Sequence, residues 1–162
     1  PTERYYEEEG RAELTPRDFG ILMHRVFENA ATTDEIYTAI EAMTQDGVLD
    51  EKEAPRLREL VEKALADPVT AEWFGGRWQV VRNENEIILP GSGTTRRPDR
   101  VMTDGERAVV VDYKFGDRET ARHRKQIREY LRLLRQMGYT RTEGYLWYVR
   151  LGRTERVEEK ED

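Results

Sequence analysis

The stretch Val109-Val110-Val111-Asp112-Tyr113-Lys114, with Arg97-Pro98-Asp99-Arg100-Val101 shortly before it, decides the fold. Its first three residues form a continuous apolar run, which predicts a central strand that is buried on both faces. The run then ends abruptly in charged residues. Because side chains two residues apart on a strand point the same way, Asp112 and Lys114 are expected to share one face.

A hairpin is expected to join the two stretches. Asp104-Gly105 lies between them and is typical of a two-residue turn between antiparallel strands. With the turn centred there, we expect Asp99 to pair near Phe115 or Lys114 and so to lie close to Asp112. Two carboxylates and a lysine would then converge at the end of an apolar strand. Paired carboxylates suit a hard divalent ion such as Mg²⁺ or Mn²⁺.

Apolar periodicity along the rest of the chain indicates an α/β protein. Helical spacing predicts helices over 15–30, 33–43 and 54–66, and a long helix over 119–137. Shorter apolar runs predict strands over 78–81, 87–89, 98–102, 108–113 and 144–149. This order favours a small mixed β-sheet flanked by helices, with an N-terminal helical portion before it.

The length of 162 residues suits a single domain. We expect a lead-in over 1–14, the helical portion over 15–75, an α/β core over 76–153 and a charged tail over 154–162. The sequence does not begin with Met, so we expect a fragment of a longer polypeptide. It contains no Walker A motif, so it has no ATP-driven motor of its own.

The composition excludes several classes of protein. The chain has no cysteine, which rules out disulfides, thiolate zinc sites, iron–sulfur clusters and cysteine nucleophiles. No apolar run approaches the roughly 18–20 residues of a membrane span. The N-terminal residues also lack a signal-peptide pattern. We therefore expect a cytoplasmic protein with no membrane partner.

Charge is distributed unevenly along the chain, whose formal net charge is −6. Residues 1–95 carry a net charge of −10, residues 96–153 carry +7, and residues 154–162 carry −3. A basic segment within an acidic chain favours one surface that attracts polyanions. The helix over 119–137 and the residue before it supply a group of candidate contacts to the phosphates of DNA or RNA, although each is individually typical of a solvated surface: Arg118, Arg122, Arg124, Lys125 and Arg128.

Pro98-Asp99 followed by Asp112-Tyr113-Lys114 resembles the signature of the PD-(D/E)xK nuclease superfamily. More narrowly, the chain is similar to the RecB/AddA-type nuclease domain at the C-terminus of UvrD-like helicase–nucleases. Four further matches support the narrower resemblance: Gly20 to His24 with Glu28, Glu84 ahead of the 87–89 strand, Gly116 after the lysine, and Gln126 with Tyr130. The resemblance covers about residues 15–150 and implies a restriction-endonuclease-like fold.

The resemblance implies a metal site. His24, Asp99, Asp112 and the backbone carbonyl of Tyr113 would bind Mg²⁺, with Mn²⁺ as a substitute. Lys114 would position or deprotonate the attacking water and offset charge on the phosphoryl group. The relatives that carry an iron–sulfur cluster are excluded, because this chain has no cysteine.

The resemblance also implies a reaction and a setting. Gln126, Tyr130 and Glu84 would complete the catalytic set. The expected activity is Mg²⁺-dependent hydrolysis of DNA phosphodiester bonds, of the exonuclease type, on single strands or duplex ends. The enzyme would act in double-strand-break repair and recombination, beside helicase motor domains in the same parent chain or in a partner subunit.

Several residues have a second interpretation. Glu84 and Glu86 are two residues apart, so either can be the acidic residue of the motif, although motif spacing favours Glu84. Tyr130 has the helical spacing of a core residue, and Glu28 is equally typical of a solvated surface. His123 is expected at the surface, near the start of its helix.

Two other functions stay open from the sequence. Taken alone, Asp112 and Lys114 are typical of an ordinary ion pair at a strand end. If they form only such an ion pair, the chain is an inactive nuclease-like module that binds DNA or serves as a scaffold. A stand-alone restriction or junction-resolving endonuclease of the same fold is the third possibility.

Overall fold

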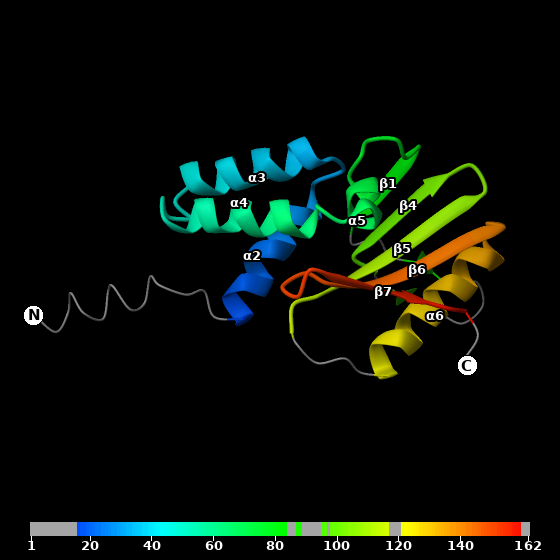
Figure 1. Ribbon diagram of the computed structural model, residues 1–162. Coiled ribbons are helices and arrows are strands. Elements are labelled where there is room, and N and C mark those ends of the chain that lie inside the picture. The colour runs from blue at the N-terminus through cyan, green and yellow to red at the C-terminus, as the bar shows by residue number, and fades with distance from the viewer. Residues whose placement is uncertain (1–15, 84–86, 89–94, 97, 117–120, 160–162) are drawn as a thin grey trace, which may run out of the picture.

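A five-stranded mixed sheet forms the centre of the molecule, with its strands in the order β1-β4-β5-β6-β7 (Figure 1). The computed structural model describes residues 16–83, 87–88, 95–96, 98–116 and 121–159. Strands β5 and β6 are parallel, and the other neighbouring pairs are antiparallel. The strands are β1 (Val80–Asn83), β4 (Arg100–Asp104), β5 (Arg107–Lys114), β6 (Arg141–Tyr148) and β7 (Arg153–Val157).

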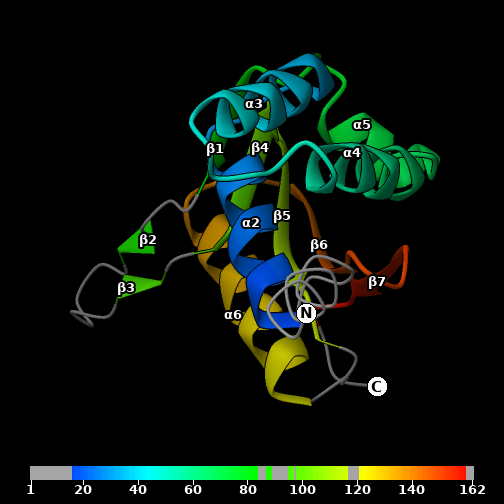
Figure 2. The same ribbon diagram turned by 90° about the vertical axis from the view of Figure 1, so that its left-hand side faces the viewer.

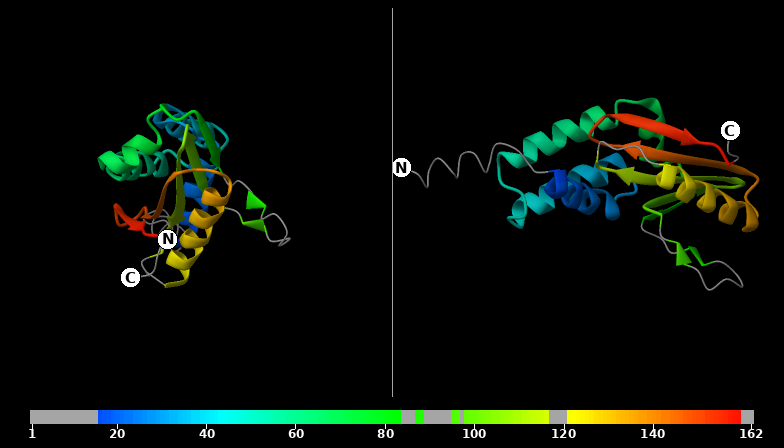
Figure 3. Two further views of the ribbon diagram at one scale, coloured as in Figure 1. Left: turned by 90° about the vertical axis from the view of Figure 1, so that its right-hand side faces the viewer. Right: turned by 90° about the horizontal axis from the view of Figure 1, so that it is seen from below.

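Helices pack on both faces of this sheet and bury a hydrophobic core against each face (Figure 2, Figure 3). One face packs against a helical portion, and the other packs against α6 (Ala121–Gln136). The helical portion consists of α2 (Pro16–Glu28), α3 (Thr33–Gln45), α4 (Glu53–Ala64) and α5 (Pro68–Trp73). The expected α/β architecture is therefore confirmed. Of the helices that the structure describes, none has the length and apolar character needed to cross a membrane.

Strand β5 occupies the middle of the sheet because its apolar run can be buried on both sides. Val109 and Val111 belong to the core beside the helical portion, whereas Val110 belongs to the core beneath α6. All three are fully buried, which confirms the prediction. The close packing of α6 on β6 depends on Gly144, because a Cβ there would lie only 2.5 Å from a methyl carbon of Ile127.

The hairpin between β4 and β5 forms as expected, but its turn lies one residue further along the chain. Asp104 pairs with Arg107, so the turn residues are Gly105 and Glu106. Gly105 has a φ of 58°, in the left-handed region that glycine adopts most readily.

This register decides which residue lies across from Asp99. Continuing the β4–β5 ladder by one residue places Asp99 opposite Asp112. The prediction that Asp99 pairs near Phe115 or Lys114 is therefore wrong. The two aspartates are direct neighbours across the strands, which is closer than the sequence suggested.

The structure differs from the predicted elements in three places. Residues Ile87–Ile88 (β2) pair with Thr95–Arg96 (β3) in a separate two-stranded sheet, which stands away from the main sheet in Figure 2. The short helix α5 was not predicted; it begins at a proline that follows the capping residue Asp67. The predicted tail is wrong for residues 154–157, because β7 adds them to the sheet edge beside β6.

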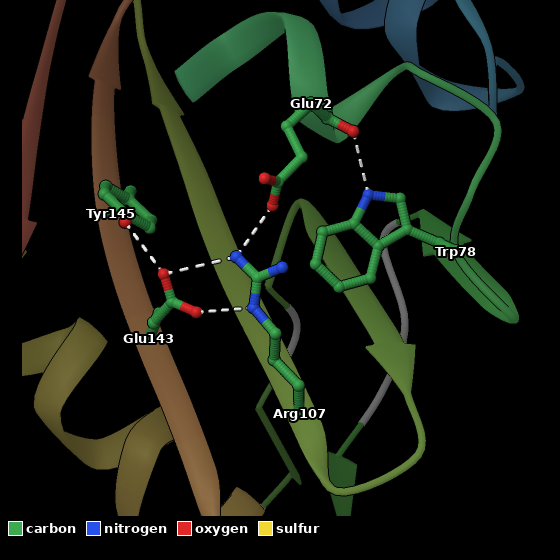
Figure 4. Close-up of polar contacts among 5 residues, drawn as sticks. All are labelled: Glu72, Trp78, Arg107, Glu143 and Tyr145. Carbon is green, nitrogen blue, oxygen red and sulfur yellow. Dashed lines mark hydrogen bonds and ion pairs between the residues drawn. The ribbon is translucent and has the colours of Figure 1, made fainter. Parts of the chain in front are cut away.

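A network of ion pairs joins β5, β6 and α5 at the end of the sheet where β5 begins (Figure 4). The guanidinium of Arg107 donates to Glu143 at 2.6 Å, forms an ion pair with Glu72 at 2.7 Å, and lies 4.8 Å from the ring centre of Trp78. Burial raises the pKa of Glu143, but hydrogen bonds from Arg107 and Tyr145 outweigh it, so the pKa lies below its ordinary value. This network fixes the sheet end opposite Lys114.

Candidate active site

Two aspartates lie side by side where β4 begins and β5 ends, and each is held by the backbone of the other strand. The backbone N–H of Asp99 donates to Oδ1 of Asp112 at 3.1 Å. The backbone N–H of Tyr113 donates to Oδ2 of Asp99 at 2.7 Å. These reciprocal bonds fix both carboxylates at one point, and the half-buried Lys114 ends the same strand two residues beyond Asp112.

His24 reaches this point from helix α2. Its Nδ1 lies 3.8 Å from Oδ1 of Asp99, and its ring centre lies 4.9 Å from that of Phe115. One turn earlier, Gly20 has no side chain, and a Cβ there would lie 3.4 Å from the Cβ of Phe115. The absence of a side chain at Gly20 therefore lets the end of β5 approach α2 closely. His24 joins the aspartate pair as the sequence suggested.

The electrostatics of the pair are set mainly by burial. Asp112 is only 3% exposed, and this burial raises the pKa of its carboxyl above the ordinary value. The hydrogen bond from the Asp99 backbone and the charges of Lys114 and His24 act in the opposite direction, but do not cancel the effect. A cation bound nearby stabilises the ionised form of such a buried carboxyl group.

The donor set fits a hard divalent cation of the Mg²⁺ type. Carboxylate oxygens from Asp99 and Asp112 are suitable ligands, and the His24 imidazole is a further nitrogen donor. Across the described residues, no three His, Cys, Asp or Glu side chains are arranged to hold a metal by themselves. This is compatible with Mg²⁺, which keeps several waters and commonly binds through one or two carboxylates together with substrate phosphate. The Tyr113 carbonyl is the backbone ligand that the family resemblance implies.

A fully buried arginine stabilises the strand that carries Asp99. Arg100 is 0% exposed and donates to three backbone carbonyls. These are Ala30 at 2.6 Å and Ala31 at 2.9 Å, just after α2, and Trp73 at 2.7 Å in α5. The α2 segment that carries the histidine is thereby tied to the start of β4. Sequence reasoning missed this role, because the three acceptors are backbone atoms distant in the chain.

Helix α6 carries a second polar group, on the other face of the sheet. The side-chain amide of Gln126 donates to the hydroxyl of Tyr130 at 3.1 Å, and Tyr130 is 1% exposed. Tyr130 is therefore a core residue as well as a hydrogen-bonding partner. His123 lies in the first turn of α6, as expected, and is half-buried. Burial, followed by the charge of Lys114, lowers its pKa. The first turn of α6 thus lies beside the lysine.

The predicted DNA contacts divide into two groups. Arg124 forms an ion pair with Glu155 in β7, and Nε of Arg128 donates to the backbone carbonyl of residue 158. Arg122 and Lys125 instead line a polar pocket of about 240 Å³ with Gln126 and Glu129. Three further residues that the sequence singled out, Glu84, Glu86 and Arg118, lie outside the described residues.

Comparison with known proteins agrees with this geometry. Residues 2–162 match the sequence profile of the PD-(D/E)XK nuclease superfamily. No curated protein is significantly similar to the chain in sequence. The profile covers nearly the whole chain, including both strands that carry the aspartate pair. The chain therefore belongs to the PD-(D/E)XK nuclease superfamily, and its mixed sheet with flanking helices is consistent with the restriction-endonuclease-like fold of that family.

Proposed function

We propose that this chain is a Mg²⁺-dependent deoxyribonuclease that hydrolyses phosphodiester bonds. The observation that carries the proposal is the reciprocal hydrogen bonding of Asp99 and Asp112, with His24 and Lys114 beside them. Superfamily membership supports the same reaction class and DNA as the substrate.

The residues have distinct roles in the proposed reaction. Asp99, Asp112, His24 and the Tyr113 carbonyl would hold the metal, which supplies Lewis-acid polarisation of the phosphoryl oxygen and lowers the pKa of bound water. Lys114 positions the attacking water and offsets the negative charge that develops on the phosphoryl oxygens. The water oxygen bonds to phosphorus as the bond to the leaving sugar oxygen breaks. The attacking water gives up a proton and the departing sugar oxygen takes one up from solvent, so that the products are a phosphate monoester and a hydroxyl.

We further propose that the domain acts as an exonuclease within a helicase–nuclease that processes DNA breaks. The support is the resemblance of two helices to the RecB/AddA type. The helix with Gly20 and His24 packs against the end of β5, and the helix with Gln126 and Tyr130 packs on the opposite face. The motor would be a separate domain or subunit.

Cleavage of end-labelled single-stranded and duplex DNA tests the activity. The purified chain is incubated with Mg²⁺, with Mn²⁺ or with EDTA, beside Asp112→Asn and Lys114→Ala variants. Asp104→Asn, an exposed carboxylate at the β4–β5 turn, and Lys63→Ala, an exposed lysine on α4, are matched controls. We expect metal-dependent cutting that each site variant reduces by about 100-fold or more, while both controls retain it.

The products of the same assay distinguish the finer proposals. Shortening from a terminus indicates an exonuclease, whereas cutting of a circular substrate indicates an endonuclease. Metal-dependent binding of DNA without any cutting would favour the inactive module. Cutting that is equal in the wild type and in Asp112→Asn would refute the assigned site.

A further inference from the structure

The hairpin between β6 and β7 lies at the same end of the sheet as the aspartate pair. The backbone N–H of Val149 donates to the carbonyl of Lys114 at 3.1 Å, so the first residue after β6 is tied to the last residue of β5. Residues 149–152 then turn back into β7, with Gly152 at a φ of 60°. Figure 1 shows this turn beside the N-terminal half of α2. The hairpin therefore borders the candidate active site.

Arg150, at the tip of this hairpin, makes a cation–π contact with a ring of α2. Its guanidinium carbon lies 5.8 Å from the ring centre of Phe19. The ring of Phe19 packs edge-on against Phe115 at 5.9 Å, and Phe115 in turn packs against His24 at 4.9 Å. A continuous row of rings thus joins the exposed arginine to the histidine of the site.

The charge of Arg150 is not neutralised within the described structure. None of the described carboxylates forms an ion pair with it, and its side chain is exposed. By contrast, Arg124 and Arg135 form ion pairs with Glu155 and Glu159. A cation–π contact orients a guanidinium but leaves its charge in place, and guanidinium groups bind phosphate through several donors. Arg150 is therefore a cation held in position beside the site.

We propose that Arg150 binds a backbone phosphate of the DNA on the α2 side of the active site. This inference rests on the proposed nuclease function and adds a substrate contact to it. Arg122 and Lys125 lie on α6, beyond the other face of the sheet. The DNA would therefore be held from two sides of the Asp99–Asp112 pair, with Arg150 on the helical-portion side.

Fluorescence anisotropy of labelled single-stranded and duplex oligonucleotides tests this contact, with EDTA present so that the strands stay intact. Arg150→Ala is compared with Arg150→Lys and with Arg141→Ala. Arg141 is an exposed arginine at the opposite end of β6, so it matches the charge change without the location. We expect Arg150→Ala to weaken binding by about fivefold or more and to reduce the salt slope by about 0.7 for single strands and about 0.9 for duplex.

The controls separate this inference from the proposed function. Arg150→Lys keeps the charge and is expected to keep the salt slope, and Arg141→Ala is expected to bind like the wild type. In cleavage with metal, Arg150→Ala should raise KM and leave kcat nearly unchanged. Equal affinities for Arg150→Ala and Arg141→Ala would overturn the inference, as would wild-type binding that is absent or independent of salt. The nuclease proposal is judged separately, by metal-dependent cleavage and its loss in Asp112→Asn.

Discussion

Replacement of Arg100 by methionine removes a buried cation but leaves its partners in place. The guanidinium donates to the backbone carbonyls of Ala30, Ala31 and Trp73, and also to Oδ1 of Asn83 at 3.2 Å. Methionine fills much of the same volume and cannot donate a hydrogen bond. The substitution therefore removes the guanidinium donors from three backbone carbonyls, of which, in the part of the chain that the structure describes, only that of Ala30 keeps another donor, the side-chain amide of Asn83.

The magnitude follows from those carbonyls. Each buried acceptor that loses its donor costs about 1–3 kcal/mol. The Ala30 carbonyl keeps the Asn83 amide at 3.4 Å, so the carbonyls of Ala31 and Trp73 carry most of the loss, at least about 2 kcal/mol together. Part of this is recovered, because a methionine does not carry the desolvation cost of the guanidinium. Loss of the contact between Arg100 and the ring of Phe74, at 4.0 Å, adds to the cost. We expect the free energy of unfolding to fall by about 2–4 kcal/mol.

Urea unfolding followed by tryptophan fluorescence measures this loss, because Trp73 and Trp147 lie in the core. Arg141→Met, at an exposed position, is the matched control and should change the stability by less than about 0.5 kcal/mol. Arg100→Lys keeps one donating group and should recover part of the loss. A decrease below about 1 kcal/mol for Arg100→Met would refute the argument that this arginine ties α2 and α5 to β4.

Three further predictions follow from single positions. Because burial raises the folded-state pKa of Asp112, ionisation of this carboxyl costs stability at neutral pH, and the cost disappears as the pH falls through that pKa. Asp112→Asn in EDTA should therefore be more stable than the wild type at pH 7, and the difference in stability should shrink in acid. Urea unfolding at several pH values measures this difference. A variant less stable than the wild type at neutral pH would contradict the prediction. Gly144→Ala should destabilise the fold by about 1–3 kcal/mol, because its Cβ would lie 2.5 Å from a methyl carbon of Ile127. Thermal unfolding tests this steric cause beside Gly116→Ala, where a Cβ meets nothing within 4 Å. Equal losses of stability in the two variants would argue against it. Tyr130→Phe should keep the fold and remove the partner of the Gln126 amide, with a loss of about 0.5–1.5 kcal/mol by urea unfolding; no change would show that the bond contributes nothing.

Local sequence patterns were sufficient to predict the elements that carry the site. The apolar run Val109–Val111 and the polar residues after it predicted both the central strand and the strand end at which Asp112 lies. The helix that begins at Thr33 was likewise predictable, because its apolar spacing is a property of a short segment, although its N-cap is Thr32. Such signals depend on residues close together in the chain, and tertiary packing does not alter them here.

Features that depend on distant segments were not predictable. Strand β7 runs over charged residues, and only its pairing with β6 makes it a strand. The burial of Arg100 requires carbonyls that three other segments supply. The partner of Asp99 depends on which two residues form the β4–β5 turn: a turn at Asp104-Gly105 would place it opposite Val110, and the observed turn places it opposite Asp112. The predicted pairing near Phe115 or Lys114 lay too far along the chain for either turn. Dependence on distant segments also kept Arg150 out of the predicted DNA contacts, because its position beside α2 arises only in the folded chain.

The most direct test of the central claim is a calorimetric titration of the metal-free chain with Mn²⁺. The claim is that the Asp99–Asp112 pair forms the divalent-metal site of a nuclease. We predict a binding isotherm for the wild type and for Asp104→Asn, and a loss of affinity of at least about tenfold for Asp99→Asn and Asp112→Asn. Identical isotherms for all four proteins, or no binding by the wild type in the presence or absence of DNA, would contradict the account.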